Sequence, residues 1–132
     1  IDYSAVSVEK SKKVNKAAVA NGRCEVLQGS VADMIFADNR FDTVTAFETV
    51  YFWQELPQCF REVWRVLKPG GIFFICNESN GDTDKDEKWT KIITGMTIYK
   101  DTELKAYLEQ AGFHDVQAYK NKMGWLCVTA KK

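Results

Sequence analysis

The chain has 132 residues, of which 45% are hydrophobic and 13% aromatic, a composition that suits one globular core and not a disordered chain. Lysine plus arginine equals aspartate plus glutamate at 18 each, so the basic surface that nucleic-acid binding normally needs is not expected. No stretch approaches the roughly 20 apolar residues of a membrane span, so we expect no membrane partner either.

Four cysteines are widely spaced along the chain, and no two of them form a C-x-x-C pair. At least three fall on predicted buried strands or on the apolar face of a helix. This pattern favours reduced core cysteines in a cytoplasmic protein over zinc ligands or disulfides, and we expect no metal site.

The first forty residues predict a strand end, one helix and one short strand. Ile1-Asp2 has the pattern of a strand end. The helix is expected to run from Ser4 to about Ala20, with Ser4 or Ser7 as N-cap, and to lie on the outside of a sheet. Cys24–Gln28 is the expected short strand. Because the chain starts inside an element, we expect a domain that is incomplete at its N-terminus.

The stretch from residue 41 to residue 76 predicts a strand, a crossover helix and a second parallel strand. Thr43–Phe47 is an apolar, β-branched and aromatic run, and Glu48 interrupts it where a strand would end. Leu56–Leu67 has helical periodicity, and the Pro-Gly-Gly at 69–71 predicts a sharp stop. Ile72–Cys76 is apolar enough to be buried on both faces. The polar residues after each strand are where a ligand is expected.

The remaining residues predict two helices and a closing hairpin. The first helix starts near Asp82, and its apolar face (Trp89, Ile92, Ile93 and Met96) is expected to pack on the sheet rather than to form a lid. Asp82–Lys88 should be a solvated face. The second helix runs from Asp101 to Gly112. Phe113–Tyr119 and Trp125–Ala130 are the hairpin strands.

This order of elements predicts a single α/β domain over residues 1–132. Alternating strands and helices indicate a doubly wound, mainly parallel sheet with helices on both faces. The C-terminal hairpin should add one antiparallel strand at an edge of that sheet.

Four segments together resemble class I S-adenosylmethionine-dependent methyltransferases of the small-molecule kind that carry a type 11 methyltransferase domain. The resemblance implies a Rossmann-like fold, S-adenosylmethionine as cofactor and a small-molecule methyl acceptor. The four segments are Asp2-Tyr3-Ser4, residues 29–36 with Phe41-Asp42, Glu62–Gly71 (EVWRVLKPGG) and Tyr99–Phe113.

Two departures from the family pattern bear on the site. The family's first strand and its G-x-G-x-G loop are not in this sequence, so we expect the chain by itself to bind cofactor weakly and to be weak or inactive. Ser30 stands where the family often has an aspartate beside the adenine amino group, and a serine oxygen accepts that N–H more weakly.

The resemblance assigns the cofactor to residues at three places in the chain. Asp2, with Tyr3, would hold the ribose hydroxyls, although an N-terminal Asp can also be a helix cap. Ser30 and the Val31 N–H would contact the adenine, although a plain turn has the same sequence. Phe47 and Glu48 end the next strand and complete the cofactor set.

The methyl acceptor is expected against residues that follow two strands. Tyr51, Phe52 and Trp53 are successive aromatics that a helix cannot all bury on one side, so Tyr51 and Trp53 are candidate acceptor contacts. Asn77 and Glu78 follow the next strand, where a solvated strand end is the equal alternative. No catalytic base is assigned.

Two other functions remain open at this point. A nicotinamide-dependent oxidoreductase also uses an acid after its second strand, although the closing hairpin disfavours it. A non-enzymatic methyltransferase remnant that folds by forming a homodimer is the second alternative, since the missing strand would leave sheet edges unpaired.

Overall fold

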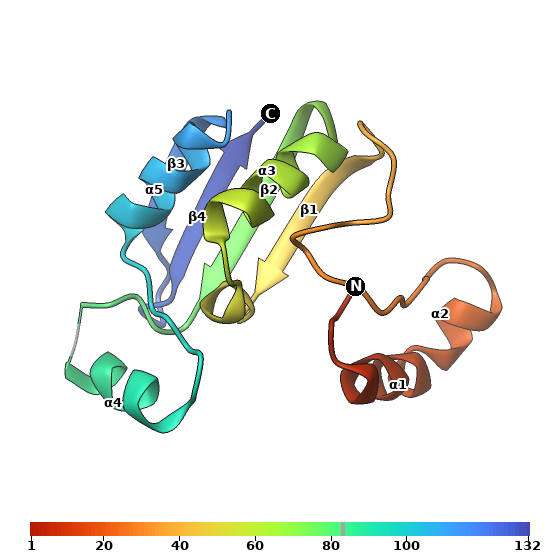
Figure 1. Cartoon of the computed structure of the whole chain (residues 1–132), viewed down its shortest axis with the longest axis horizontal. Helices are drawn as coiled ribbons and strands as arrows, with labels where there is room; N and C mark the ends of the chain where they lie inside the picture. The colour runs from red at the N-terminus through yellow and green to blue at the C-terminus, as the bar shows by residue number, and fades with distance from the viewer. Residues whose placement is uncertain (83) are drawn as a thin grey trace.

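The computed structural model describes residues 1–82 and 84–132, and the side chains at 84, 85 and 87 also lie outside the description. Within that part, no helix is long and apolar enough to cross a membrane. The elements, drawn in Figure 1, are α1 (Ala5–Val14), α2 (Lys16–Ala20), β1 (Phe41–Phe47), the short 3₁₀ helix η1 (Val50–Phe52), α3 (Leu56–Val66), β2 (Leu67–Asn77), α4 (Asp84–Ile92), α5 (Asp101–Gln110), β3 (His114–Lys120) and β4 (Leu126–Lys131).

The four strands form one mixed sheet in the order β1-β2-β4-β3. β1 and β2 are parallel, and β4 runs antiparallel to both β2 and β3. The predicted α/β class with one antiparallel strand is therefore confirmed. The position of that strand is not, because β4 lies inside the sheet and β3 forms the edge. The burial pattern explains this, since β4 is almost wholly buried whereas β3 is mostly exposed.

The predicted unit of strand, crossover helix and strand is present as β1, α3 and β2. The buried residues of α3 recur with helical spacing, and Pro57 lies in its first turn. β2 begins at Leu67, directly after the helix, and the pairing with β1 shifts between Phe41 and Thr43. Gly71 lies in this irregular part, where an added Cβ would come within 2.8 Å of the Lys68 carbonyl oxygen and 3.1 Å of the Asp42 carbonyl oxygen. The Pro-Gly-Gly sequence, expected to end the helix, instead lies inside β2 at this irregularity, because the helix already ends at Val66.

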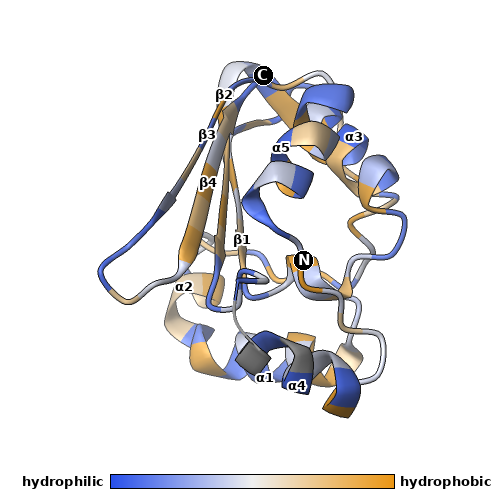
Figure 2. Ribbon diagram, turned by 90° about the vertical axis from the view of Figure 1, so that its left-hand side faces the viewer, coloured by the Kyte–Doolittle hydropathy of each residue, from blue (hydrophilic) through white to orange (hydrophobic). Residues whose placement is uncertain are grey.

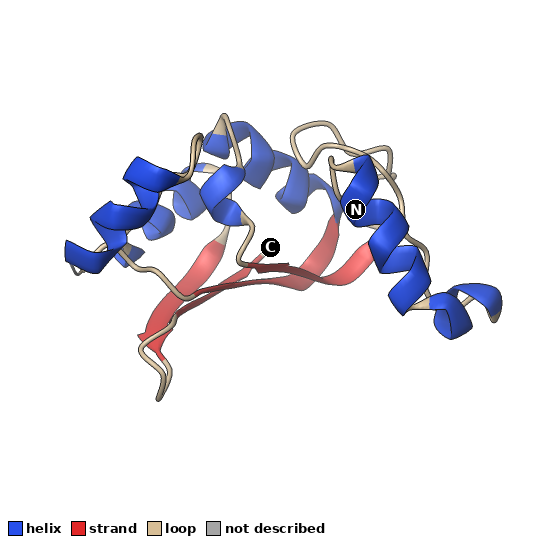
Figure 3. Ribbon diagram, turned by 90° about the horizontal axis from the view of Figure 1, so that it is seen from below, coloured by secondary structure: helices blue, strands red, loops and turns tan. Residues whose placement is uncertain are grey.

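Helices α3 and α5 pack on one face of the sheet, which was expected to have helices on both. Figures 2 and 3 show the strands as a layer with these helices on one side. The core between them contains Phe60 and Leu108 from the helices and Phe73, Ile75 and Val128 from the sheet. The opposite face of β2 and β4 carries other residues, including Ile72, Phe74 and Cys127, which are not part of this core.

The N-terminal segment does not join the four-stranded sheet. The two strands expected at Ile1-Asp2 and Cys24–Gln28 are replaced by one isolated parallel bridge between Asp2 and Gln28. The single expected helix is split at Asn15, whose side-chain amide donates to the Ser11 carbonyl and so competes with the helix backbone. Figures 1 and 2 place α1 and α2 to one side of and below the sheet, not upon it.

The α4 region also differs from its prediction. Trp89 and Ile92 are exposed, so this helix does not bury its apolar face on the sheet as expected. The predicted solvated face at Asp82–Lys88 lies partly outside the described residues.

One arginine holds the loop before β1 against α3. The Arg65 guanidinium donates to the carbonyl oxygens of Met34 and Phe36 at 2.9 and 2.8 Å, and to the Asp38 and Glu62 carboxylates at 2.7 and 2.8 Å. A planar fork of donors suits this set of acceptors, which a lysine could not satisfy. The loop from residue 34 to residue 38 is thereby fixed beside the helix that precedes β2.

Candidate functional site

The carboxyl ends of β1 and β2 lie side by side, and Glu48 connects them. Its backbone N–H donates to the Cys76 carbonyl at 3.0 Å, which extends the strand pairing. Its φ of 55° lies in the left-handed region, which is unfavourable for a residue with a side chain. The Glu48 Oε1 accepts from the Glu78 N–H at 2.5 Å. Desolvation by burial raises the pKa of Glu48. Glu48 is thus a partly desolvated carboxyl group, and it lies at the strand end on an unfavourable backbone conformation.

Tyr51 fastens the chain that follows β2. Its buried hydroxyl accepts from the Ser79 N–H at 2.7 Å and donates to the Ser79 carbonyl at 3.1 Å. Its own carbonyl accepts from the Thr97 N–H at 2.8 Å. Burial raises the pKa of the Tyr51 phenol above its ordinary value, so the group stays protonated near neutral pH and is no candidate base there. Ser79 and Thr97, at the two ends of the segment between them, are thus both hydrogen-bonded to Tyr51.

Asn77, the last residue of β2, has no solvent exposure, yet neither its Nδ2 nor its Oδ1 has a hydrogen-bond partner among the residues that the structure describes. Leaving a buried polar group unsatisfied costs about 1–3 kcal/mol. Such groups in native proteins normally have a partner in protein, water or ligand. This amide is therefore the feature at the strand ends that most directly indicates a bound polar group.

The second group of predicted residues surrounds the bridge between Asp2 and Gln28. The Asp2 N–H donates to the Leu27 carbonyl at 3.1 Å, and the Gly29 N–H donates to the Asp2 carbonyl at 3.0 Å. The Asp2 Oδ1 accepts from the Ser4 N–H at 2.8 Å. The Ser30 Oγ accepts from the Ala32 N–H at 3.1 Å. The bridge therefore places the backbone of Asp2 beside Gly29, the residue before Ser30, and the role of these side chains in binding cofactor stays a prediction.

The other predicted residues lie in varied surroundings. Tyr3 is exposed, whereas Val31 is half-buried and packs against the core. Trp53 stacks on Phe73 inside the core, with ring centroids 6.2 Å apart. Phe47 is 56% exposed and contacts Phe74 on the sheet face that α3 and α5 leave open.

The structure thus brings the predicted residues together in two groups rather than one. Ser79 is a residue that sequence reasoning missed, because its role depends on two backbone atoms and not on its side chain. The first group, at the ends of β1 and β2, is Glu48, Tyr51, Asn77 and Glu78; the second, at the N-terminal bridge, is Asp2, Tyr3, Ser30 and Val31.

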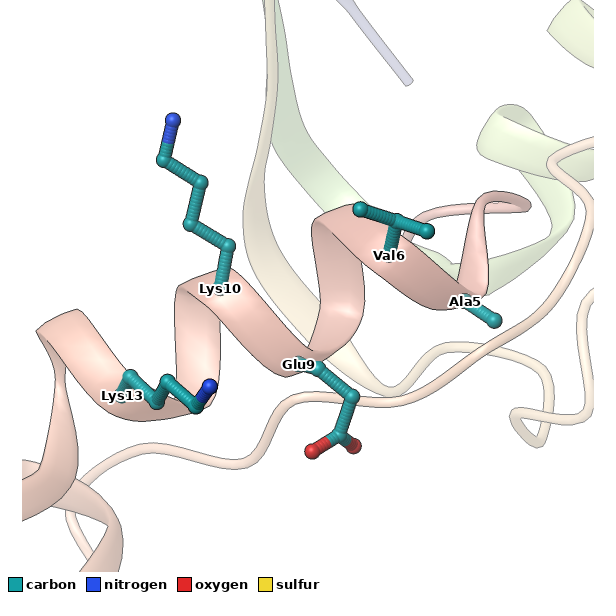
Figure 4. A pocket seen from close by; sticks show the side chains of 5 residues that line it. All are labelled: Ala5, Val6, Glu9, Lys10 and Lys13. Atoms are coloured by element: carbon teal, nitrogen blue, oxygen red, sulfur yellow. The ribbon is translucent and has the colours of Figure 1, made fainter.

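Two hollows lie away from both groups. One, of about 440 Å³, runs along α1, and Figure 4 shows that all five lining side chains come from this helix. A hollow with walls from a single helix is an open surface and not a closed site. The other, of about 230 Å³, is lined by residues of β2, β3 and β4 that include Ile72 and Gln117. Among the described residues, no cluster of three or more histidine, cysteine or acidic side chains could hold a metal ion.

Comparison with known proteins adds a family and relatives. The sequence profile described as "Methyltransferase domain" matches residues 1–75. The chain is 34% identical over 75 residues to cycloartenol-C-24-methyltransferase 1 of Oryza sativa subsp. japonica, covering 57% of this chain and 22% of that protein. It is 33% identical over 105 residues to phosphoethanolamine N-methyltransferase 1 of Triticum aestivum, covering 75% of this chain and 21% of that protein. The chain therefore spans about a fifth of the length of these relatives.

A solved structure with a similar fold is a putative O-methyltransferase from Nostoc punctiforme, with a TM-score of 0.82 and 15% sequence identity. The alignment covers 99% of this chain and 43% of that one. At this identity the likeness concerns the fold, which is Rossmann-like.

Proposed function

Since the chain belongs to the methyltransferase domain family, whose cofactor is S-adenosylmethionine, we propose that this protein transfers a methyl group from that cofactor to a small-molecule acceptor. The observation that carries the proposal is the bridge between Asp2 and Gln28, which places the backbone of an acidic residue beside Gly29, the residue before Ser30. Folds of this type hold a nucleoside with an acidic residue at the end of one parallel strand. The turn that follows the neighbouring strand lies beside that residue.

The residues of the N-terminal bridge fit the nucleoside part of the cofactor. The Ser4 N–H occupies the Asp2 Oδ1, and we assign the Asp2 Oδ2 to a ribose hydroxyl. We assign the Ser30 Oγ and the Val31 N–H to the edge of the adenine. The bound cofactor supplies an activated methyl group, so the protein needs mainly to position the acceptor and to exclude water.

The strand ends fit the acceptor side of the reaction. The unsatisfied Asn77 amide can donate to and accept from a polar group of the acceptor, and the Glu48 carboxylate, which we assign to the cofactor, follows the adjacent strand β1. We assign Tyr51 to holding this region in place, because Ser79 takes up its hydroxyl. Trp53 has a similar supporting role, since its ring is stacked in the core. The relatives named above act on a sterol and on phosphoethanolamine, and for this chain we propose only a small-molecule acceptor.

A titration of the ¹⁵N-labelled chain with S-adenosylhomocysteine, followed by NMR, tests the proposal. We expect binding with a Kd of about 1 mM or weaker, because neither of the two hollows described above is lined by a residue of either group. The shifted amides should include Asp2, residues 29–31 and Glu48. Adenosine is the matched control and should shift only the N-terminal set.

Two results would contradict these expectations. Shifts confined to other regions at saturating ligand would overturn the site assignment and the proposed function with it. Micromolar binding would support the function and overturn only the expected weakness of this chain.

The unpaired edge of β1 favours a second candidate, in which copies of the chain associate without acting as an enzyme. β1 pairs only with β2 within the four-stranded sheet, so its outer edge has backbone groups free for another strand. Light scattering should then give a dimer, and S-adenosylhomocysteine should leave the NMR spectrum unchanged. A monomer that binds the ligand would exclude this candidate.

A further inference from the structure

The sheet face that α3 and α5 leave open has one row that combines two aromatic residues with two cysteines. The strand register places Phe47 opposite Cys76, Cys76 opposite Cys127 and Cys127 opposite Tyr119. These residues alternate with the core residues of their strands, so their side chains share the other face. The row crosses all four strands at the end of β2 that carries Asn77.

The two cysteines of this row have their sulfur atoms in non-bonded contact. The Cys127 thiol donates to the Cys76 sulfur, with 3.7 Å between the sulfur atoms, and both residues are free thiols. Directly opposite residues of antiparallel strands have Cα atoms about 4.5–5.5 Å apart, inside the range of about 4.4–6.8 Å that a disulfide spans. Rotation of the two side chains can therefore bring the sulfur atoms to the length of a disulfide bond with little movement of the strands.

Access to the pair differs from access to a core thiol. Cys76 and Cys127 are only 7% and 4% exposed. The neighbouring side chains in the row, Phe47 and Tyr119, are themselves 56% and 52% exposed, and neither belongs to the hydrophobic core. A small molecule thus has to displace surface side chains, whereas Cys59 is buried in α3 with its sulfur 3.1 Å from the Gln54 carbonyl oxygen.

We propose that Cys76 and Cys127 form a redox-reversible site that exchanges with low-molecular-weight disulfides to give a cross-strand bond. One cysteine thiolate attacks the small disulfide, forms a mixed disulfide and releases one small thiolate. The second cysteine thiolate attacks the protein sulfur of that mixed disulfide, forms the bond between Cys76 and Cys127 and releases the second small thiolate. The two protons of the cysteines go to the two released thiolates, so the protein is oxidised and the small disulfide reduced.

The reaction should be slow at neutral pH and faster above it. Burial, the Cys127 thiol and the Glu48 carboxylate together raise the pKa of Cys76 to about 11, and Tyr119 lies on the far side of the pair. Because the thiolate is the attacking form, its fraction and the exchange rate should rise about tenfold per pH unit between about pH 7 and pH 9.

The experiment exposes the purified native chain to hydroxyethyl disulfide, alkylates the remaining thiols and measures the intact mass and the linked peptides. We expect a monomer with one cross-linked peptide pair that contains Cys76 and Cys127, an alkylated Cys59, and the partly exposed Cys24 as a mixed disulfide with the reagent. Reductant should restore four alkylation sites. Alkylated Cys76 and Cys127 after prolonged treatment at pH 9, or a link between any other pair, would overturn the proposal, and this result needs no variant.

Serine variants give matched controls. Cys24→Ser should leave the cross-link unchanged, because Cys24 is partly exposed and its thiol donates to the Glu25 carbonyl. Cys76→Ser and Cys127→Ser should each abolish the cross-link. A cross-linked mass that survives either variant would assign the bond elsewhere. Oxidation in urea should give mixed pairings, which would show that the native fold selects this pair.

Discussion

At the scale of single residues, the most informative feature is the buried amide of Asn77. The prediction that it lies near an acceptor rested on its place after a predicted strand, and the strand is confirmed. That it is wholly buried, with no hydrogen-bond partner among the described residues, could not be predicted, because burial depends on tertiary packing that a local stretch of sequence does not contain. The hydrogen bonds between the Tyr51 hydroxyl and the Ser79 backbone could not be predicted from the sequence for the same reason.

Replacing Asn77 with leucine should stabilise the chain in the absence of ligand. Leucine has a similar volume and removes two unsatisfied polar atoms, so we expect the free energy of unfolding in urea to rise by about 1–3 kcal/mol. Because Asn77 is assigned to the acceptor, the same variant should leave the shifts that S-adenosylhomocysteine causes at Asp2 and Glu48 unchanged.

Asn80→Leu is the matched control for this change. The Asn80 side chain donates to the Gly124 carbonyl and accepts from the Asp82 N–H, so its loss should lower stability by about 1 kcal/mol. Equal destabilisation by the two variants would mean that Asn77 is satisfied in solution.

At the scale of elements, local patterns gave α3, α5 and the four sheet strands with bounds that differ by a few residues from the structure. These elements have periodic apolar faces that a short window of sequence reveals. The strand order and the open sheet face depend on pairing between distant segments, and periodicity carries no information on that. Cys24–Gln28 has strand-like residues but finds only one bridge, and a strand needs more partners than that.

Gly71→Ala should damage the junction between α3 and β2. The added Cβ would lie against two backbone carbonyl oxygens, of Lys68 and Asp42, which cannot move without shifting β1 from β2. We expect a loss of about 1–3 kcal/mol in urea unfolding. Gly70→Asn is the control, since Gly70 has a φ of 77° but open space, and asparagine tolerates that region. A smaller effect at Gly71 than at Gly70 would contradict the steric argument.

At the scale of the whole molecule, the N-terminal segment buries far fewer of its side chains than the sheet does. α1 buries only Val8, and α2 buries none of its residues. Helices this short are marginal without packing. The family resemblance predicted the kind of fold, but it could not show that this segment would stand apart from the sheet.

Amide hydrogen exchange should reveal this difference. We expect α1 and α2 to exchange far faster than β2 and β4, as measured by mass spectrometry of peptides. α5 is the matched control, because it has the same length as α1 but buries Leu104 and Leu108. Equal protection of α1 and α5 would mean that the N-terminal segment is held more firmly than its burial indicates.

The fastening of the chain at Tyr51 has an evolutionary consequence. Ser79 and Thr97 are both hydrogen-bonded to Tyr51. The segment between them can therefore change in length or sequence while its two ends keep their positions. Related chains with the same anchor can therefore differ in the length and sequence of residues 80–96 while Tyr51 and the strands beside it stay unchanged.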